Sequence, residues 1–272
     1  MDGKIFLSII LGIVQGLAEW LPVSSKTIIM IILIILGAKA SLAYDLAISL
    51  HMGTLIAALT VYGPMIIRDI RKDKFKSVQA RFVTFASLST ALTGLPLYLL
   101  VHRLLDIDIV STKYIAMALN LLFIMTAIIL LKTRFKGDKD IDEVSLKDSF
   151  IIGITQGFSA VPGVSRSGIT IFSAALLGFN ASASLDLSFM LSVLSIPAAV
   201  FMSFTFGGKP VTMWFLDVNG MIATISAALT GVAAIKVLRR IALNLTSSKL
   251  ILLLSTIAVI LGLASFLPCL TF

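Results

Sequence analysis

The same motif occurs twice in this chain, once near its start and once past its midpoint. The run Gly-Ile-Val-Gln-Gly at 12–16 matches Gly-Ile-Thr-Gln-Gly at 153–157, and 16 of the 48 positions from 12 to 59 are identical without a gap. Shared apolar composition explains part of this match, but not the matched Gln, Gly, Ser and Asp residues. In membrane proteins, repeats of this kind build one polar site where the two halves meet near the middle of the bilayer. We therefore look for function in the polar residues of the repeats.

The composition identifies an integral membrane protein. The chain is 58% hydrophobic and 13% charged, and a soluble domain of 272 residues could not bury that much apolar surface. Its excess of basic residues lies in short loops, a pattern of membrane topology that requires no nucleic-acid partner. The single cysteine, Cys269, excludes an intramolecular disulfide and a multi-cysteine metal site. The segment from Met1 to Ser25 resembles a signal peptide, but Gln15 and Glu19 interrupt its apolar run, so we assign it to the mature fold.

Six segments are predicted to span the membrane, because each has about 20 apolar residues. They are 44–67, 82–102, 112–132, 184–206, 213–236 and 250–270. Two further apolar stretches, 4–36 and 148–178, are broken midway by proline and polar residues. Each is predicted to form a re-entrant helical hairpin, because irregular backbone at membrane depth must be buried or line a wet cavity.

The predicted fold is therefore an all-α polytopic membrane protein with an inverted-topology repeat. One membrane domain covers 1–272, with repeat one at about 4–132, a linker at 133–147 and repeat two at about 148–270. Each repeat has one hairpin and three spans, and because three is odd the second copy must be inverted. Fifteen basic residues fall on one side and five on the other. The basic side is cytoplasmic, which predicts a plasma-membrane protein with both termini and the site facing outside.

Charge inside a membrane indicates function. Gln15 and Glu19 are four residues apart, hence on one face of a helix. The polar residues that follow the two breaks are Ser24, Ser25 and Lys26 in the first repeat and Ser165, Arg166 and Ser167 in the second. A helix start offers free N–H groups to a phosphate, and hydroxyls and an arginine fork add hydrogen bonds. Thr170, four residues after Arg166, is predicted to face the same cavity.

Structural explanations compete with these assignments. Serine and threonine also pack membrane helices closely, and Gln15 and Gln156 could only bond freed backbone groups. Glu19 and Arg166 could form a buried structural ion pair. Asp45 and Asp186 recur at the starts of spans, where they are expected to cap helices or favour the helix dipole. His51 lies within a predicted span and is expected to contribute less than Glu19.

The segments 15–25 and 162–170 resemble the two signatures of the undecaprenyl-diphosphatase family, the bacitracin-resistance phosphatases. The region from Asp45 to His51-Met52-Gly53-Thr54 between them is similar too. The resemblance covers nearly the whole chain. It implies an interdigitated inverted repeat and an extracytoplasmic site that hydrolyses a polyprenyl diphosphate carrier to the monophosphate with a divalent cation.

Position by position, the resemblance implies roles for the signature residues. Gln15 and Glu19 correspond to the family's acidic motif, and Ser25 to its serine. Its phosphate-binding residues correspond to Ser165, Arg166 and Thr170. There is one departure, because the family's histidine position is Ile28, which can neither accept a proton nor attack phosphorus. Glu19 is then the candidate base, and Lys26 could neutralise phosphate charge.

The sequence thus predicts a membrane phosphatase acting on an undecaprenyl or dolichyl diphosphate, and a homodimer is an assembly it leaves open. Its predicted catalytic residues are Glu19, Ser25 and Arg166; its phosphate-binding residues are Gln15, Ser24, Lys26, Ser165, Ser167 and Thr170. A Mg²⁺ or Ca²⁺ would be held by Glu19 and substrate phosphates. Two alternatives stay open: a transporter or flippase of a lipid phosphate, and a non-catalytic lipid-binding relative.

Overall fold

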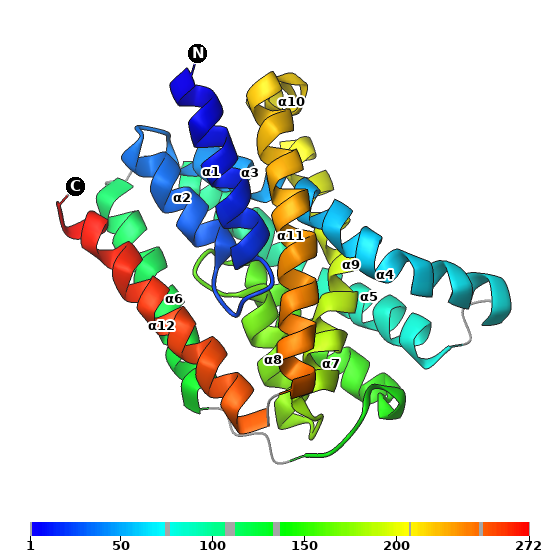
Figure 1. The fold of residues 1–272 in the computed structure, drawn as a ribbon. Helices are drawn as coiled ribbons and strands as arrows, with labels where there is room; N and C mark the ends of the chain where they lie inside the picture. Colours follow the sequence, from blue (N-terminus) through cyan, green and yellow to red (C-terminus); the bar gives the residue numbers. More distant parts are fainter. Residues whose placement is uncertain are drawn as a thin grey trace.

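In the computed structural model, the described residues are 2–73, 77–106, 112–132, 137–206, 208–244 and 247–271. They form twelve α-helices and two short 3₁₀ helices, with one isolated β-bridge between Lys139 and Phe179, which confirms the all-α class (Figure 1). Parts of one predicted basic loop (74–76) and of the predicted linker (133–136) lie outside the described residues.

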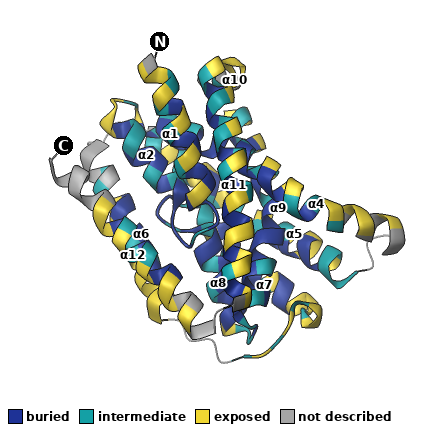
Figure 2. Cartoon of the chain, viewed as in Figure 1, coloured by how far each residue is buried: buried dark blue, intermediate teal, exposed yellow. Residues whose placement is uncertain are grey.

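Both interrupted stretches form helical hairpins, as predicted. Helices α1 (Asp2–Ala18) and α2 (Ser25–Ile35) make the first, and α7 (Leu146–Gly157) and α8 (Arg166–Leu176) make the second. In Figure 1 the two hairpins enter from opposite ends of the molecule and their connecting loops meet in the middle. Figure 2 shows that the loop between α1 and α2 is buried, whereas exposed residues follow the outer faces of the surrounding helices.

Each returning helix begins at a serine cap. Ser24 Oγ accepts a hydrogen bond from the Thr27 N–H at 3.4 Å, and Ser165 Oγ accepts one from the Gly168 N–H at 3.1 Å. A serine at this position satisfies an N–H group that has no partner inside the helix. The matched serines of the two repeats therefore fix where α2 and α8 begin.

Four helical stretches are long and apolar enough to cross a bilayer: Ala40–Met65, Val78–Leu105, Ala181–Phe206 and Val218–Leu243. They correspond to four of the six predicted spans. The other two are the helices α6 (Thr112–Lys132) and α12 (Ser247–Thr271), whose apolar stretches are shorter within the described residues. Their crossing of the membrane remains a prediction.

The predicted span 44–67 is two helices, α3 (Ala40–Ser49) and α4 (His51–Asp73), that meet at Leu50. At this point the Gly53 N–H bonds the carbonyl of Leu50, three residues back, instead of four. Such a tightened turn interrupts a regular helix. The interruption places His51 at the first position of α4.

The predicted span 213–236 begins too early. Helix α10 (Gly208–Leu216) ends first, and α11 (Val218–Asn244) begins after it. The separator is Asp217, whose carboxylate accepts hydrogen bonds from the backbone N–H and the side-chain amide of Asn219. An aspartate cap of this kind starts a new helix, and apolar content alone does not reveal it.

The repeats interlock through their first hairpin helices. Helix α1 packs along α11, and α7 packs along α5 (Val78–Asp106). A Cβ on Gly12 would overlap the carbonyl oxygen of Ala223, and a Cβ on Gly153 would overlap that of Ala86. Glycine is thus required for these backbones to approach so closely. The hairpin of each repeat is held by a long helix of the other.

The matched contacts show that the repeat register changes along the chain. We call the alignment that pairs Gly12 with Gly153 the first register. The run 86–94 (Ala-Ser-Leu-Ser-Thr-Ala-Leu-Thr-Gly) corresponds instead to 223–231 (Ala-Thr-Ile-Ser-Ala-Ala-Leu-Thr-Gly), an alignment with a smaller offset that we call the second register. Gly16 and Gly157, paired in the first register, face Gly231 and Gly94, which are paired in the second. The second repeat is therefore slightly shorter before this helix.

Asp45 and Asp186 do not cap helices, contrary to expectation. Asp45 lies inside α3, where its Oδ2 is 3.3 Å from His102 Nε2; Asp186 lies inside α9 (Ala181–Phe206), where its Oδ1 is 3.0 Å from Arg239 Nε. His102 and Arg239 are equivalent in the second register. The aspartate therefore ties α3 to α5 in repeat one and α9 to α11 in repeat two.

Candidate active site

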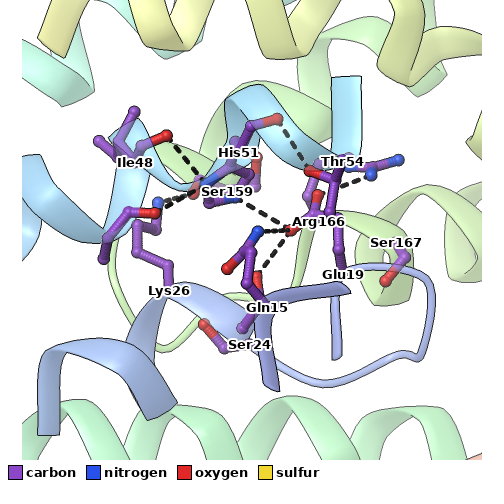
Figure 3. A network of polar contacts seen from close by, with 12 residues as sticks. Gln15, Glu19, Ser24, Lys26, Ile48, His51, Thr54, Ser159, Arg166 and Ser167 are labelled. Atoms are coloured by element: carbon purple, nitrogen blue, oxygen red, sulfur yellow. Dashed lines mark hydrogen bonds and ion pairs between the residues drawn. The ribbon is translucent and has the colours of Figure 1, made fainter. Parts of the chain in front are cut away.

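Glu19 is the centre of the polar cluster where the hairpins meet (Figure 3). It follows the last residue of α1 and is 5% exposed. Its Oε1 accepts a hydrogen bond from Arg166 Nη2 at 2.8 Å; its Oε2 accepts bonds from Ser25 Oγ at 2.7 Å and from Gln15 Nε2 at 3.1 Å. Glu19 is therefore in direct contact with the other two predicted catalytic residues, Ser25 and Arg166. Gln15, predicted to bind phosphate, instead supports the carboxylate.

The two hairpin loops are bonded to each other. Ser165 Oγ donates to the carbonyl of Val23 at 3.0 Å, and Ser167 Oγ donates to that of Leu21 at 2.5 Å. Gly163, whose φ of +98° favours glycine, donates its N–H to Thr27 Oγ1 at 2.6 Å. These bonds fix the distance between the two helix starts and confirm that they converge.

Arg166 is held on three sides. Besides Glu19, its guanidinium bonds the carbonyl of Ser188 through Nη1 at 3.0 Å, and its Cζ lies 5.7 Å from the ring centre of Trp20. Its Nε is buried and has no hydrogen-bond partner within the described part of the chain. A buried donor without a partner costs free energy. A substrate oxygen is one group that could satisfy it.

His51 is a site residue that the sequence analysis underestimated. Its Nε2 lies 3.0 Å from Glu19 Oε2, and its Nδ1 lies 2.9 Å from the carbonyl oxygen of Ala47 and 3.1 Å from that of Ile48. Since carbonyl oxygens only accept, Nδ1 carries a proton, and Nε2 is the nitrogen that faces the carboxylate. The sequence did offer one signal, because His51 belongs to the His-Met-Gly-Thr run that resembles the family. A single uninterrupted helix over 44–67, as predicted, did not indicate that the His51 side chain points toward Glu19.

Ile28, at the family's histidine position, points elsewhere. It packs against an apolar cluster that includes Phe123 and Ala127 of α6 and Ala258 of α12. It is not among the residues that line the cavity beside Glu19. The Ile28 side chain therefore does not face Glu19, although its helix does through Ser25, and an imidazole reaches Glu19 from α4 instead.

Lys26 connects the first hairpin to the second. Its Nζ donates to the carbonyls of Ser159 at 2.7 Å and Ala160 at 3.2 Å, and lies 5.4 Å from the ring centre of Tyr44. Tyr44 donates its own hydroxyl to the Ala160 carbonyl at 3.0 Å. An ammonium has three protons, so one remains for a group in the cavity that Lys26 lines.

Ser24, Ser165 and Thr170, which are also predicted to bind phosphate, have hydrogen-bond partners at helix ends or between helices. The Ser24 and Ser165 hydroxyls cap their helices. Thr170 Oγ1 bonds the Arg166 carbonyl at 2.8 Å and pairs with Ser188 Oγ at 2.6 Å, so it joins α8 to α9. Thr170 and Ser165 are absent from the cavity wall, whereas Ser24 and Ser167 contribute to it.

A cavity of about 320 Å³ adjoins the cluster. Its polar wall includes Glu19, Ser25, Lys26, His51 and Arg166. Much of the remaining wall comes from α5 and α9, including Leu95, Leu194 and Phe201, which are 45%, 45% and 68% exposed. Because these side chains reach both the cavity and the outer surface, the cavity opens sideways between α5 and α9, where a membrane protein faces lipid.

The residues present do not by themselves form a cation site. Around the cavity, among the described residues, Glu19 is the one carboxylate, and the described residues contain no cluster of three acidic, histidine or cysteine side chains suited to a metal. Both Glu19 oxygens already accept hydrogen bonds, one of them from a guanidinium. A divalent cation prefers carboxylate oxygens free of competing cations.

Comparison with known proteins gives a consistent assignment. The sequence profile of the family described as "Bacitracin resistance protein BacA" matches residues 8–264. The chain is 32% identical to an undecaprenyl-diphosphatase of Pyrobaculum aerophilum over 263 residues, covering 94% of each chain. It is 33% identical to one of Methanothrix thermoacetophila over 242 residues (89% and 90% of the two chains), and 32% identical to one of Methanopyrus kandleri over 270 residues (96% and 97%). The chain therefore belongs to the BacA family of bacitracin resistance proteins.

Proposed function

We propose that this protein is an integral membrane phosphatase that hydrolyses a polyprenyl diphosphate to the monophosphate and inorganic phosphate. One observation supports this most strongly: a buried cluster of Glu19, Ser25, His51 and Arg166 lines a cavity whose other walls are mostly apolar and reach the lipid-facing surface. A charged phosphate head and a hydrocarbon chain are both accommodated by such a cavity. The names of the three relatives support the same substrate class.

The geometry assigns roles in phosphoryl transfer. Ser25 Oγ already donates its proton toward Glu19, so Glu19 can accept that proton as Ser25 attacks the terminal phosphorus. A new Ser25 O–P bond forms, the bond from that phosphorus to the bridging oxygen breaks, and the lipid monophosphate leaves with the bridging oxygen. Water then hydrolyses the phosphoserine. In the alternative route Ser25 orients a water that attacks directly, and Glu19 accepts the proton of that water.

Arg166 and His51 complete this chemistry. The Arg166 guanidinium, fixed by Ser188 and Trp20, can stabilise charge that develops on the phosphoryl oxygens. His51 Nε2 can receive from Glu19 the proton taken from Ser25 and deliver it to the leaving oxygen. Lys26 offers a positive charge beside this group without entering the hydrogen bonds of Glu19.

The decisive experiment is release of phosphate from an undecaprenyl or dolichyl diphosphate by the purified protein in detergent. We expect turnover with the diphosphate and none with the corresponding monophosphate. Failure to release phosphate from either diphosphate would reject the function. A chelator arm tests the cation separately: since Glu19 is engaged by Arg166 and His51, a required Mg²⁺ or Ca²⁺ would arrive with the substrate phosphates.

His51→Ala is expected to lower kcat by about 100-fold, the lower end of general acid–base catalysis, with little change in KM. The physical reason is that Glu19 would lose the nitrogen that takes up its proton. His102→Gln is the matched control, because it alters the chain's other histidine, which bonds Asp45 away from the cavity. Equal kcat values for His51→Ala and the unmodified protein would show that His51 is structural.

For localisation we propose a plasma-membrane protein with its termini and site outside, on the strength of the 15-to-5 split of basic residues. Lys39 and Lys147, both exposed, lie on the predicted outer and inner sides. A membrane-impermeant thiol reagent applied to intact cells should label Lys39→Cys and not Lys147→Cys, in a chain carrying Cys269→Ala. The reverse labelling would invert the topology. The carrier's chain length and a homodimer remain predictions.

A further inference from the structure

Two pairs of long helices are equivalent under the repeat, and they are packed differently. Helix α4 lies against α11, and the corresponding pair in the other half is α9 with α5. Positions on α4 and α9 correspond in the first register, and positions on α11 and α5 correspond in the second. Gly53 thus corresponds to Leu194, and Ala227 corresponds to Thr90.

The α4–α11 pair is closed by small residues. A Cβ on Gly53 would lie 2.6 Å from Ala227 Cβ and would overlap the carbonyl oxygen of Thr224. Four residues later, a Cβ on Gly231 would lie 2.9 Å from Ala57 Cβ. Ala57 and Ala227 are 0% exposed. We call this contact, made by Gly53, Ala57, Ala227 and Gly231, the closed seam.

The α9–α5 pair carries different residues at the same positions, and it encloses the cavity. Leu194 occupies the position of Gly53, and Thr90 the position of Ala227. Ala198 and Gly94 correspond to Ala57 and Gly231, yet all four of these residues line the cavity. Leu194 is 45% exposed and Ala198 is also exposed. We call these four cavity-lining positions, Leu194, Ala198, Thr90 and Gly94, the open seam.

The difference bears on the transporter alternative. In an inverted repeat, alternating access lets the two halves exchange conformations around a fixed site. Such an exchange would require α9 and α5 to pack against each other at the open seam as tightly as α4 and α11 pack at the closed seam. At the closed seam, even one carbon added to Gly53 would overlap the backbone of the facing helix. Leu194, at the equivalent position of the open seam, carries a much larger side chain. The exchange is therefore blocked by the sequence of α9 itself.

We propose that the open seam is the permanent entrance for the substrate's hydrocarbon chain and that the closed seam stays shut throughout turnover. The protein then processes lipid through one side of its fold and does not carry it across the bilayer. This inference rests on the proposed function for the identity of the substrate, but the behaviour of the two seams can be measured without activity.

The test uses two register-matched cysteine pairs in a Cys269→Ala chain: Ala57→Cys with Gly231→Cys across the closed seam, and Ala198→Cys with Gly94→Cys across the open seam. Mild oxidation in membranes should give a disulfide in the closed-seam pair and none in the open-seam pair. A disulfide requires the two Cβ atoms to lie within about 4.5 Å. Spontaneous disulfide formation across the open seam would show that it closes and would overturn the proposal.

Turnover and lipid movement supply the second measurement. The rate of phosphate release should be the same before and after oxidation of the closed-seam pair. A bifunctional maleimide that joins the two open-seam cysteines should lower that rate by about tenfold or more. In proteoliposomes, the protein should not accelerate transbilayer movement of a fluorescent polyprenyl phosphate. Movement that stops when the closed seam is oxidised would reject the proposal. If the unmodified protein releases no phosphate, the proposed function fails, while the disulfide pattern still decides the seams.

Discussion

Glu19→Gln is expected to abolish turnover, with kcat lower by about 10²- to 10⁴-fold. The carboxylate accepts hydrogen bonds at both oxygens, from Arg166 at Oε1 and from Ser25 and Gln15 at Oε2, and His51 Nε2 lies 3.0 Å from Oε2. An amide has one acceptor oxygen and one donor nitrogen. Whichever way the new side chain turns, one set of donors faces an NH₂ group, and no base remains for the Ser25 proton.

The matched control for this change is Glu143→Gln. Glu143 is the chain's other glutamate, and it bonds the backbone N–H of Asp140 in the exposed segment before α7. This variant should keep full turnover. Glu19→Gln should still bind the lipid, as measured by partition of a fluorescent polyprenyl diphosphate analogue onto the protein.

Stability must be measured alongside activity, because removing one member of a buried ion pair costs up to about 3–5 kcal/mol. Glu19→Asp supplies the second variant. It retains a negative charge near Arg166, but its side chain is one methylene group shorter, so the carboxylate lies farther from Ser25 Oγ. Two outcomes would show that Glu19 is not the base. One is a folded Glu19→Asp protein with the kcat of the unmodified protein, and the other is a folded Glu19→Gln protein with that same kcat.

Arg166→Lys is expected to lower kcat/KM by about 10²- to 10³-fold, the loss typical of removing one oxyanion-stabilising donor. Arginine supplies a planar fork that reaches Glu19, the Ser188 carbonyl and, through Nε, the cavity. Lysine retains the charge but not this geometry. The variant should fold, because the ion pair with Glu19 can still form.

Arg239→Lys is a matched control for that change. Arg239 also pairs with an acidic residue and lies over an aromatic ring, with its Cζ 5.6 Å from the Tyr62 ring centre, but its side chain is 47% exposed and lies away from the cavity. Comparable losses in both variants would indicate a general effect of arginine loss on the fold. Unchanged turnover in Arg166→Lys would make the Arg166–Glu19 contact structural.

Much of the architecture follows from local sequence signals. Proline and polar residues inside apolar runs predicted both hairpins, and Ser24 and Ser165 begin the returning helices because each satisfies an otherwise unpaired N–H group. Glu19 and Arg166 could be assigned to one site because charge at membrane depth is costly and must find a partner. Their 2.8 Å contact shows that the two side chains meet.

Other features depended on how distant helices pack. His51 reaches Glu19 only because the apolar run 44–67 is interrupted at Leu50 and turned by contacts with other helices. Ile28 faces α6, and Lys26 bonds the opposite hairpin, although both lie within one turn of Ser25. The direction of a side chain on a buried helix follows from its neighbours, which periodicity alone does not identify when every face is apolar.

By itself, the sequence determined that the chain crosses a membrane, that it contains a repeat, and that two serine-capped helix starts meet beside Glu19 and Arg166, since each of these properties follows from local sequence signals. Only the tertiary structure decided which histidine serves the site and which of the two equivalent helix pairs is open. Those outcomes depend on single substitutions, such as Leu194 for Gly53, whose effect is expressed only against the backbone of a helix that is distant in the chain.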